Sequence, residues 1–393
     1  MHFEQPLEIY VAWHPSFEEG MDHAKRLFSI FCRDYKKPFD TTLSIPTYFR
    51  YLGEDNIPAP IETGNVSKCA IVLLIDDNII IDKKFRTYVD RLVQVEKDSS
   101  GNHRIFPIAF TKSFNNLHEF ISSKNVIRAY DDRLLSTLAC SQDDLIKSAL
   151  LHEVSRLMLQ LEAVQAESLL GAPPPIRLFL SHSKHDSTQN SAMEFKRFIH
   201  DRTQLKTFFD VHDIGYGYDF ADEIKKGIRE SVLVVFQSDS YASREWCRIE
   251  AITAKAHNCP VIVVNALEKG EKRSFPYLGN VPTIRLGGSN FHEIVDMALE
   301  KVLYNVYQKA LMTQMANLYN LDVNYTMANF PELFDIINIQ NQMKEGKRDF
   351  SIVLYPDPPL GSEELKLLND MNDNLFFITP NQLPTLEIIS NGR

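Results

Sequence analysis

The chain has 393 residues, which favours two or three domains, and its 44 % hydrophobic content is enough for packed cores. The formal net charge is −10 and basic runs are short, as in Lys344–Arg348, so nucleic acid is not expected as a partner. The five cysteines fall in no metal-binding spacing. There is no signal-peptide pattern, and no apolar run approaches the roughly 20 residues that span a bilayer. We therefore expect a cytoplasmic protein without a membrane partner.

Residues 1–140 read as an α/β domain. Three apolar stretches predict strands, and two stretches with apolar residues at helical spacing predict helices. The predicted strands are Leu7–Trp13, Lys68–Asp76 and Arg104–Phe110, and the predicted helices are Phe17–Asp34 and Asp82–Val95. Between them, a Pro/Gly-rich stretch predicts loops with one short strand. Pro107 makes the third strand irregular or an edge, because proline cannot donate to the ladder.

Residues 141–172 read as a connector. The pattern from Ser141 to Leu170 is helical and ends at Gly171, and Ala172–Pro175 then breaks it. Three consecutive prolines form a stiff linker and mark a domain boundary. The sequence leaves open whether the connector helix packs on either domain or pairs with another copy of the chain.

Residues 173–312 alternate strand and helix five times. The predicted strands are Arg177–Leu180, Thr207–Phe209, Val232–Phe236, Val261–Asn265 and Thr283–Leu286. The predicted helices are Ser191–His200, Phe220–Arg229, Arg244–His257 and one that starts at Phe291. This alternation predicts a doubly wound parallel sheet. With flavodoxin-like strand order, a ligand would bind beyond the carboxyl ends of the first and third strands.

Residues 313–393 read as a helical segment followed by a small β-α-β unit. The helix that starts at Phe291 is expected to end near Met315, and a less regular helical region follows to about Glu345. The unit consists of Phe350–Tyr355, Ser362–Met371 and Leu375–Thr379. It is too short to be a full domain, so we expect it to complete a neighbouring sheet that the sequence does not identify.

The stretch Val232–Glu250 carries the clearest functional signal. Val232–Phe236 reads as a buried strand, Gln237–Ser243 as a polar turn, and Ser243 is placed to cap the helix that follows. Trp246 and Glu250 are four residues apart and therefore share one helix face. A carboxylate beside a flat aromatic, just after a buried strand, suggests the floor of a nucleotide pocket.

This stretch also carries a resemblance. Its end, YASREWCRIE, resembles the Trp-x-x-x-Glu helix of Toll/interleukin-1 receptor (TIR) domains of the plant and bacterial type. Ile176–Asp186 resembles the first strand and Phe-(Ile/Leu)-Ser signature of the family, and Thr207–Ser231 resembles its second strand, loop and helix. The resemblance covers residues 174–310, with three motifs in the order and spacing of the family.

The resemblance implies a catalytic role for Glu250 in cleaving the nicotinamide–ribose bond of NAD. One carboxylate is enough on physical grounds, because the cationic nicotinamide leaves as a neutral molecule and needs no general acid. The candidate substrate-binding residues are Trp246, Phe179, Ser181, His182, Lys184, Asp210, Ser238 and Tyr241. Core packing is the competing interpretation for Trp246 and Phe179.

The resemblance implies NAD as substrate, with no cofactor and no metal. His182, His185 and Asp186 could suggest a metal site, but the family uses none, and a polar loop is the preferred interpretation. Lys184 is the one cation in its turn, which argues against a strong phosphate clamp. In the family, the loop corresponding to His212–Phe220 mediates contacts between TIR domains and gates the pocket.

The first domain resembles a degenerate copy of the second. Cys69–Tyr88 aligns with Ser231–Glu250 without a gap, which places Lys84 at the position of Trp246 and Tyr88 at that of Glu250. The first domain would then be a non-catalytic relative with a structural or sensing role. The alternative is a generic α/β domain whose likeness comes from its apolar strands.

Together, these interpretations predict a TIR-domain NAD glycohydrolase or cyclase. We expect it to be activated by self-association through TIR domains and to serve in bacterial antiphage defence or signalling. Its products would be nicotinamide and ADP-ribose or a cyclic isomer, and a regulatory partner or activator could control its assembly. The alternatives are a non-catalytic TIR scaffold and a nucleotide-sensing module that binds without cleaving. An open cleft at Glu250 would favour the enzyme, and a salt bridge that seals the carboxylate would favour the scaffold.

Overall fold

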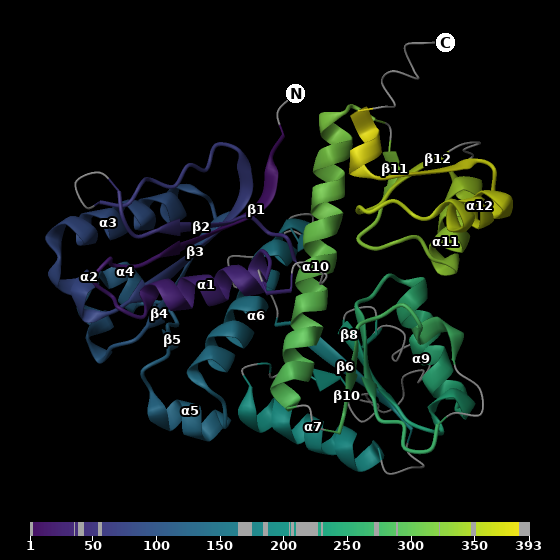
Figure 1. Cartoon of the computed structure of the whole chain (residues 1–393), viewed down its shortest axis with the longest axis horizontal. Coiled ribbons are helices and arrows are strands. Elements are labelled where there is room, and N and C mark those ends of the chain that lie inside the picture. Colours follow the sequence, from purple (N-terminus) through teal and green to yellow (C-terminus); the bar gives the residue numbers. More distant parts are fainter. Residues whose placement is uncertain are drawn as a thin grey trace.

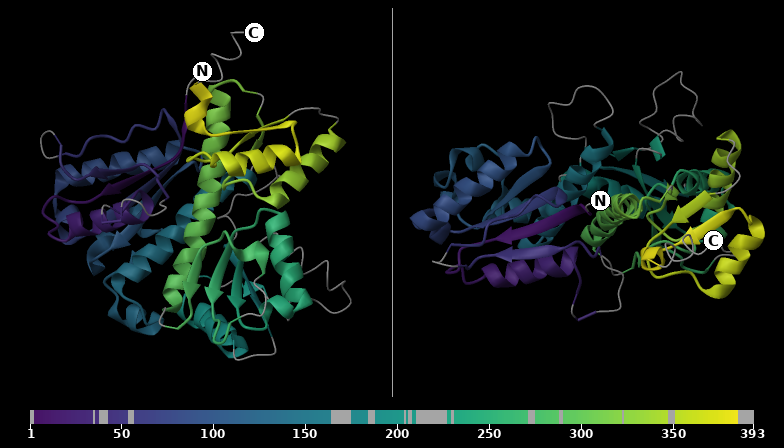
Figure 2. Two further views of the ribbon diagram at one scale, coloured as in Figure 1. Left: turned by 45° about the vertical axis from the view of Figure 1, so that its right-hand side comes forward. Right: turned by 90° about the horizontal axis from the view of Figure 1, so that it is seen from above.

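Three α/β units surround one long helix, α10 (Phe291–Leu318), in the computed structural model of the chain (Figure 1). The structure describes residues 3–34, 36–37, 43–53, 57–163, 175–183, 188–203, 205, 208–209, 227–228, 231–270, 275–287, 290–321, 323–346 and 351–384. Seen from above, α10 stands between the first unit and the C-terminal unit (Figure 2). The chain is therefore built around α10 as a common support.

The first unit is a parallel five-stranded sheet in the order β2-β1-β3-β4-β5. Its strands are β1 (Gln5–Ala12), β2 (Thr47–Arg50), β3 (Val66–Ile75), β4 (His103–Ala109) and β5 (Ile127–Arg128). Its helices are α1 (Gly20–Phe31), α2 (Asp77–Ile81), α3 (Lys83–Asp98), α4 (Glu119–Ser122) and α5 (Asp132–Leu138). β5 pairs only with Ile108 and Ala109 of β4. Pro107 therefore lies where β4 has one described neighbour, as an edge position for proline requires.

Trp13, just after β1, packs tightly in this unit. Its ring stacks on Tyr51 with centroids 4.5 Å apart and planes 7° from parallel. The backbone of Gly20 lies against the same indole, and a Cβ added at Gly20 would lie 2.2 Å from Trp13 Cδ1. Only glycine permits this approach of α1 to the end of β1.

The second unit is also a parallel five-stranded sheet, in the order β10-β9-β8-β6-β7. Its strands are β6 (Arg177–His182), β7 (Phe208–Phe209), β8 (Ser231–Gln237), β9 (Val261–Asn265) and β10 (Thr283–Arg285). α7 (Thr188–Arg202) and α10 cover one face, and α9 (Glu245–Ala256) covers the other. Read from β6, the order is 2-1-3-4-5, so the predicted flavodoxin-like fold is confirmed. The first sheet has the same order.

One hydrophobic core joins the first two units. Alternate residues of β1 and β3, the connector helix α6 (Gln142–Ala163), α10 and one face of the second sheet all contribute buried side chains to it. Polar contacts cross the same junction. Lys147 on α6 lies 3.4 Å from Asp296 and 3.0 Å from Glu300 on α10, and the Gln5 amide donates to the Tyr307 hydroxyl at 2.6 Å. The connector helix thus packs on α10 and on the first sheet, and it shares one hydrophobic core with a face of the second sheet.

The C-terminal unit (residues 323–384) is a three-stranded parallel sheet in the order β11-β12-β13. Its elements are β11 (Val323–Thr326), α11 (Leu333–Glu345), β12 (Ser351–Leu354), α12 (Ser362–Met371) and β13 (Leu375–Ile378). α11 packs on one sheet face, and the last turns of α10 pack on the other through Met312 and Ala316. The unit has its own sheet, so the expectation that it completes a neighbouring one was wrong.

Two further predictions of local structure were wrong. Ser243 does not cap α9: the N-cap is Arg244 without a side-chain bond, and the Ser243 hydroxyl donates to the Ser240 carbonyl. β11 lies in the first part of the region predicted as an irregular helix, although α11 in the same region ends at Glu345 as predicted. The helix that starts at Phe291 ends at Leu318, three residues beyond the predicted end near Met315. Across the parts of the chain that the structure describes, none of the helices has the length and apolarity to cross a membrane.

Candidate active site

Glu250 lies in the second turn of α9, on the face that packs toward the carboxyl ends of β6 and β8. Its side chain is 7 % exposed. The Ser181 hydroxyl, near the end of β6, donates a hydrogen bond to Glu250 Oε2 at 2.5 Å. Ser181 pairs with Val235 of β8, so the contact lies where strands one and three of the sheet adjoin. This is the switch point at which ligands bind in sheets of this order.

The Tyr241 hydroxyl holds the Ser181 hydroxyl in place. The Tyr241 hydroxyl lies 2.7 Å from Ser181 Oγ and 3.1 Å from the Cys247 carbonyl. Each hydroxyl has one hydrogen; because that of Ser181 goes to Glu250, that of Tyr241 is shared between Ser181 Oγ and the Cys247 carbonyl. Ser181 and Tyr241 are both fully buried. Tyr241, Ser181 and Glu250 therefore form a chain of hydrogen bonds that sets the rotamer of the carboxylate.

Trp246 is one helical turn before Glu250. Its side chain is 45 % exposed, so core packing does not account for it. A large, half-exposed indole beside a held carboxylate offers a flat apolar surface at the rim of the site.

The loops around the site are tied together. After β8, the Ser240 hydroxyl donates to Ser183 Oγ at 2.7 Å, which joins the loops that follow β6 and β8. The Asp239 carboxylate accepts three backbone N–H bonds from residues 268–270, at 2.9–3.1 Å. These bonds, the one from Lys269 first, lower the pKa of Asp239. These bonds thus join the loop after β8 to the loop after β9 at the carboxyl edge of the sheet.

A cavity of about 570 Å³ opens on the same edge, beyond β9 and β10. Its lining includes Ser191 of α7, Asn265 at the end of β9 and Arg285 at the end of β10. Glu250 and Trp246 are not part of it. The cavity is therefore separate from the carboxylate site.

The comparison with protein families decides the identity of this region. Residues 178–299, from β6 into α10, match the family model described as the TIR domain. The chain contains a TIR domain. No curated protein matches the chain. The match begins after the first unit, so the likeness of that unit to TIR domains stays a prediction.

The remaining predicted site residues of the TIR domain lie in different places. Phe179 is in the core between the sheet and α9, and Ser238 is buried. His182 is half-buried, with Nδ1 3.4 Å from the Ser183 carbonyl. Lys184, His185, Asp186, Asp210 and the loop His212–Phe220 lie outside the described residues. The described residues contain no group of three or more His, Cys, Asp or Glu side chains that could hold a metal ion.

The sequence motif located Glu250 and Trp246, but it did not reveal what holds them. Sequence reasoning missed Asp239 because its partners are about 30 residues away, and no periodic pattern links them. It missed the Ser183–Ser240 contact for the same reason. The available signal was the cluster of polar side chains in each turn after a buried strand.

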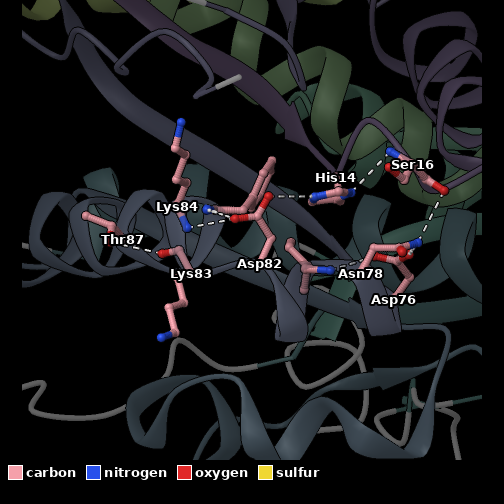
Figure 3. A network of polar contacts seen from close by, with 10 residues as sticks. His14, Ser16, Asp76, Asn78, Asp82, Lys83, Lys84 and Thr87 are labelled. Carbon is pink, nitrogen blue, oxygen red and sulfur yellow. Dashed lines mark hydrogen bonds and ion pairs between the residues drawn. The ribbon is translucent and has the colours of Figure 1, made fainter. Parts of the chain in front are cut away.

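The first unit has a polar network at the matching edge of its own sheet (Figure 3). His14, after β1, accepts from the Ser16 N–H through Nδ1, so its Nε2 carries the proton and donates to Asp82 at 3.2 Å. This bond lowers the pKa of Asp82. The Asn78 amide donates to Asp76 at 2.5 Å and to the Ser16 carbonyl at 3.2 Å. These side chains are bonded to one another, which makes the network a structural link.

At the position that aligns with Glu250, the first unit has Tyr88. Tyr88 is buried on α3, and its hydroxyl donates to the Ala59 carbonyl at 3.4 Å. Lys84, which aligns with Trp246, extends from α3 in Figure 3. The first unit therefore has neither the carboxylate nor the aromatic of the TIR domain at these positions.

Proposed function

We propose that this chain is a TIR-domain enzyme that cleaves the nicotinamide–ribose bond of NAD, with Glu250 as its catalytic carboxylate. The observation that supports this most is the held geometry of Glu250. Its carboxylate receives the Ser181 hydroxyl at the switch point of the sheet, one turn from the half-exposed Trp246. A scaffold would have no need of this pair in this place.

The chemistry requires little more than a fixed negative charge. As the C1′–N bond breaks, the bonding electrons go to the nicotinamide, which leaves neutral, and positive charge develops on the ribose. Glu250 would stabilise that charge and bind the ribose hydroxyls. A water molecule then bonds to C1′ and loses a proton to give ADP-ribose. Attack by a group of the substrate itself would give a cyclic isomer through the same transition state.

The roles of the other residues follow from their contacts. Ser181 and Tyr241 would hold the carboxylate still, so that no reorganisation is needed during bond cleavage. Trp246 would pack against the ribose or nicotinamide. Self-association of TIR domains would complete the pocket and activate the enzyme, in bacterial antiphage defence or signalling.

The test compares the protein with Glu250→Gln at high protein concentration, measuring nicotinamide release from NAD by chromatography. The matched control is Glu245→Gln, which removes an exposed carboxylate from the same helix. We expect Glu250→Gln to lower the rate at least about 100-fold and Glu245→Gln to leave it within about two-fold. Equal release by Glu250→Gln would refute the assignment.

A second candidate is a nucleotide-sensing module that binds NAD without cleaving it. The low exposure of Glu250 favours it, because the carboxylate must become accessible before it can contact C1′. In that case isothermal calorimetry would detect NAD binding to the protein, and no nicotinamide would appear at any protein concentration. The same experiment thus separates the two candidates.

A further inference from the structure

The C-terminal unit contacts the C-terminal end of α9, the helix that carries Glu250. Lys255, in the last turn of α9, lies 2.9 Å from each carboxylate oxygen of Glu332, the N-cap of α11. The side chains of Lys255 and Glu332 are 12 % and 29 % exposed, so the pair is largely shielded from water. Figure 1 shows α11 next to one end of α9. A shielded ion pair of this kind fixes position more firmly than a surface pair does.

A second polar contact is made at the same C-terminal end of α9. The Asn338 amide, on α11, donates to the Ala256 carbonyl at 2.7 Å. Ala256 is the last residue of α9, and its carbonyl has no acceptor role inside the helix. Phe334 of α11 adds a ring contact to Tyr277 with centroids 5.0 Å apart. The carbonyls of Thr253, Ala254 and Lys255 accept from the backbone of residues 257–259, and α11 supplies the donor for the Ala256 carbonyl.

The C-terminal unit also contacts α10, the helix that covers the opposite face of the TIR sheet. The Lys301 ammonium, on α10, donates to Asn329 Oδ1 at 2.5 Å, and α10 packs beneath β11, β12 and β13. α10 and α9 lie on different faces of the sheet. The C-terminal unit thus contacts the helices on both faces of the TIR sheet. Its packing fixes the C-terminal end of α9 relative to α10.

We propose that the C-terminal unit positions the active site through α9, with Lys255, Glu332 and Asn338 as the positioning residues. The proposal rests on the proposed function for its kinetic consequence. Glu250 is five residues before Lys255, about 7.5 Å along the helix axis, and Trp246 is one turn further. A short helix moves as a rod, so a shift at Ala256 displaces the carboxylate. Displacement by about 1 Å can cost 100-fold in rate.

The kinetic test uses Lys255→Met, Lys255→Arg and Asn338→Ala. The matched control is Lys124→Met, which breaks a pair of similar burial, 2.6 Å from Glu96 in the first unit. We expect Lys255→Met and Asn338→Ala to lower kcat about ten-fold with KM little changed, and Lys255→Arg to restore most of it. Lys124→Met should lower the melting temperature without lowering kcat. An equal kcat in all four variants would overturn the proposal.

A second measurement does not depend on catalysis. Amide hydrogen exchange in α9 is compared between the protein and Lys255→Met/Asn338→Ala, with β8 as the internal reference. We expect faster exchange along Glu245–Ala256 and unchanged exchange in β8. If the unaltered protein cleaves no NAD, the proposed function fails while this arm still decides the positioning role. Unchanged exchange in α9 would overturn the positioning role whatever the activity.

Discussion

Removing the Ser181 hydroxyl should disable the site without touching its carboxylate. In Ser181→Ala, Glu250 Oε2 loses the hydrogen bond that it receives at 2.5 Å, and Tyr241 loses its nearest acceptor. A hydrogen bond to a charged group contributes about 1.5–3 kcal/mol. If that energy holds the carboxylate in its working rotamer, kcat falls by about 10- to 150-fold. We expect KM to change little, because the fully buried Ser181 hydroxyl would act by holding Glu250.

The assay is steady-state nicotinamide release, with urea denaturation of each variant run alongside. The control is Ser231→Ala, on the neighbouring strand β8, where the buried hydroxyl has no hydrogen-bond partner among the described residues. Losing an unsatisfied buried hydroxyl is neutral or stabilising, so this variant should keep full activity. Tyr241→Phe should fall between the two. The reasoning is refuted if Ser181→Ala keeps the full kcat while Glu250→Gln loses it.

Two stability predictions concern the other units. Gly20→Ala should destabilise the protein by about 1–3 kcal/mol in thermal melts, because the new methyl group would lie 2.2 Å from Trp13 Cδ1. Gly64→Ala is the control, because no atom of the described residues lies within 4 Å of a Cβ added there, and equal losses would contradict the packing argument. Burial first, then the Glu332 charge, raises the pKa of Asp335 from 3.8 to about 6. The folded state therefore holds the extra proton between these values, and the stability contribution of Asp335 falls as pH rises through them. In urea denaturation, Asp335→Asn should gain about 1–3 kcal/mol relative to the unaltered protein between pH 4 and pH 7. A difference that does not vary with pH would exclude this cause.

The sequence was informative where the signal is local. Alternating buried strands and helices predicted the parallel sheet, and the four-residue spacing of Trp246 and Glu250 placed both on one helix face. Identifying the TIR family needed the motif itself, since many folds share that alternation. The aligned register also placed Tyr88 at the position of Glu250, and the structure puts each of them buried on the corresponding helix.

The rest could not be read from the sequence because it depends on tertiary packing. Lys255 and Glu332 are 77 residues apart, and each alone is an ordinary surface charge. β11 was missed because Val323–Thr326 is a four-residue strand with an irregular register against β12, too short for a clear alternation. The helical cap of α9 was misplaced because a short 3-10 turn, Tyr241–Ser243, precedes the helix.

The shared core around α10 bears on how the protein can be divided. The match to the TIR domain ends at Leu299, yet α10 continues to Leu318. Beyond Leu299, Leu303 and Tyr307 are buried in the common core with the first unit, and Met312 and Ala316 lie under the C-terminal unit. A fragment that ends at Leu299 would contain only the first part of α10. It would lack the first unit and the C-terminal unit, so apolar surface that they cover would be exposed. Any assembly of this TIR domain is accordingly an assembly of whole chains, whose spacing is set by the bulk of the other two units.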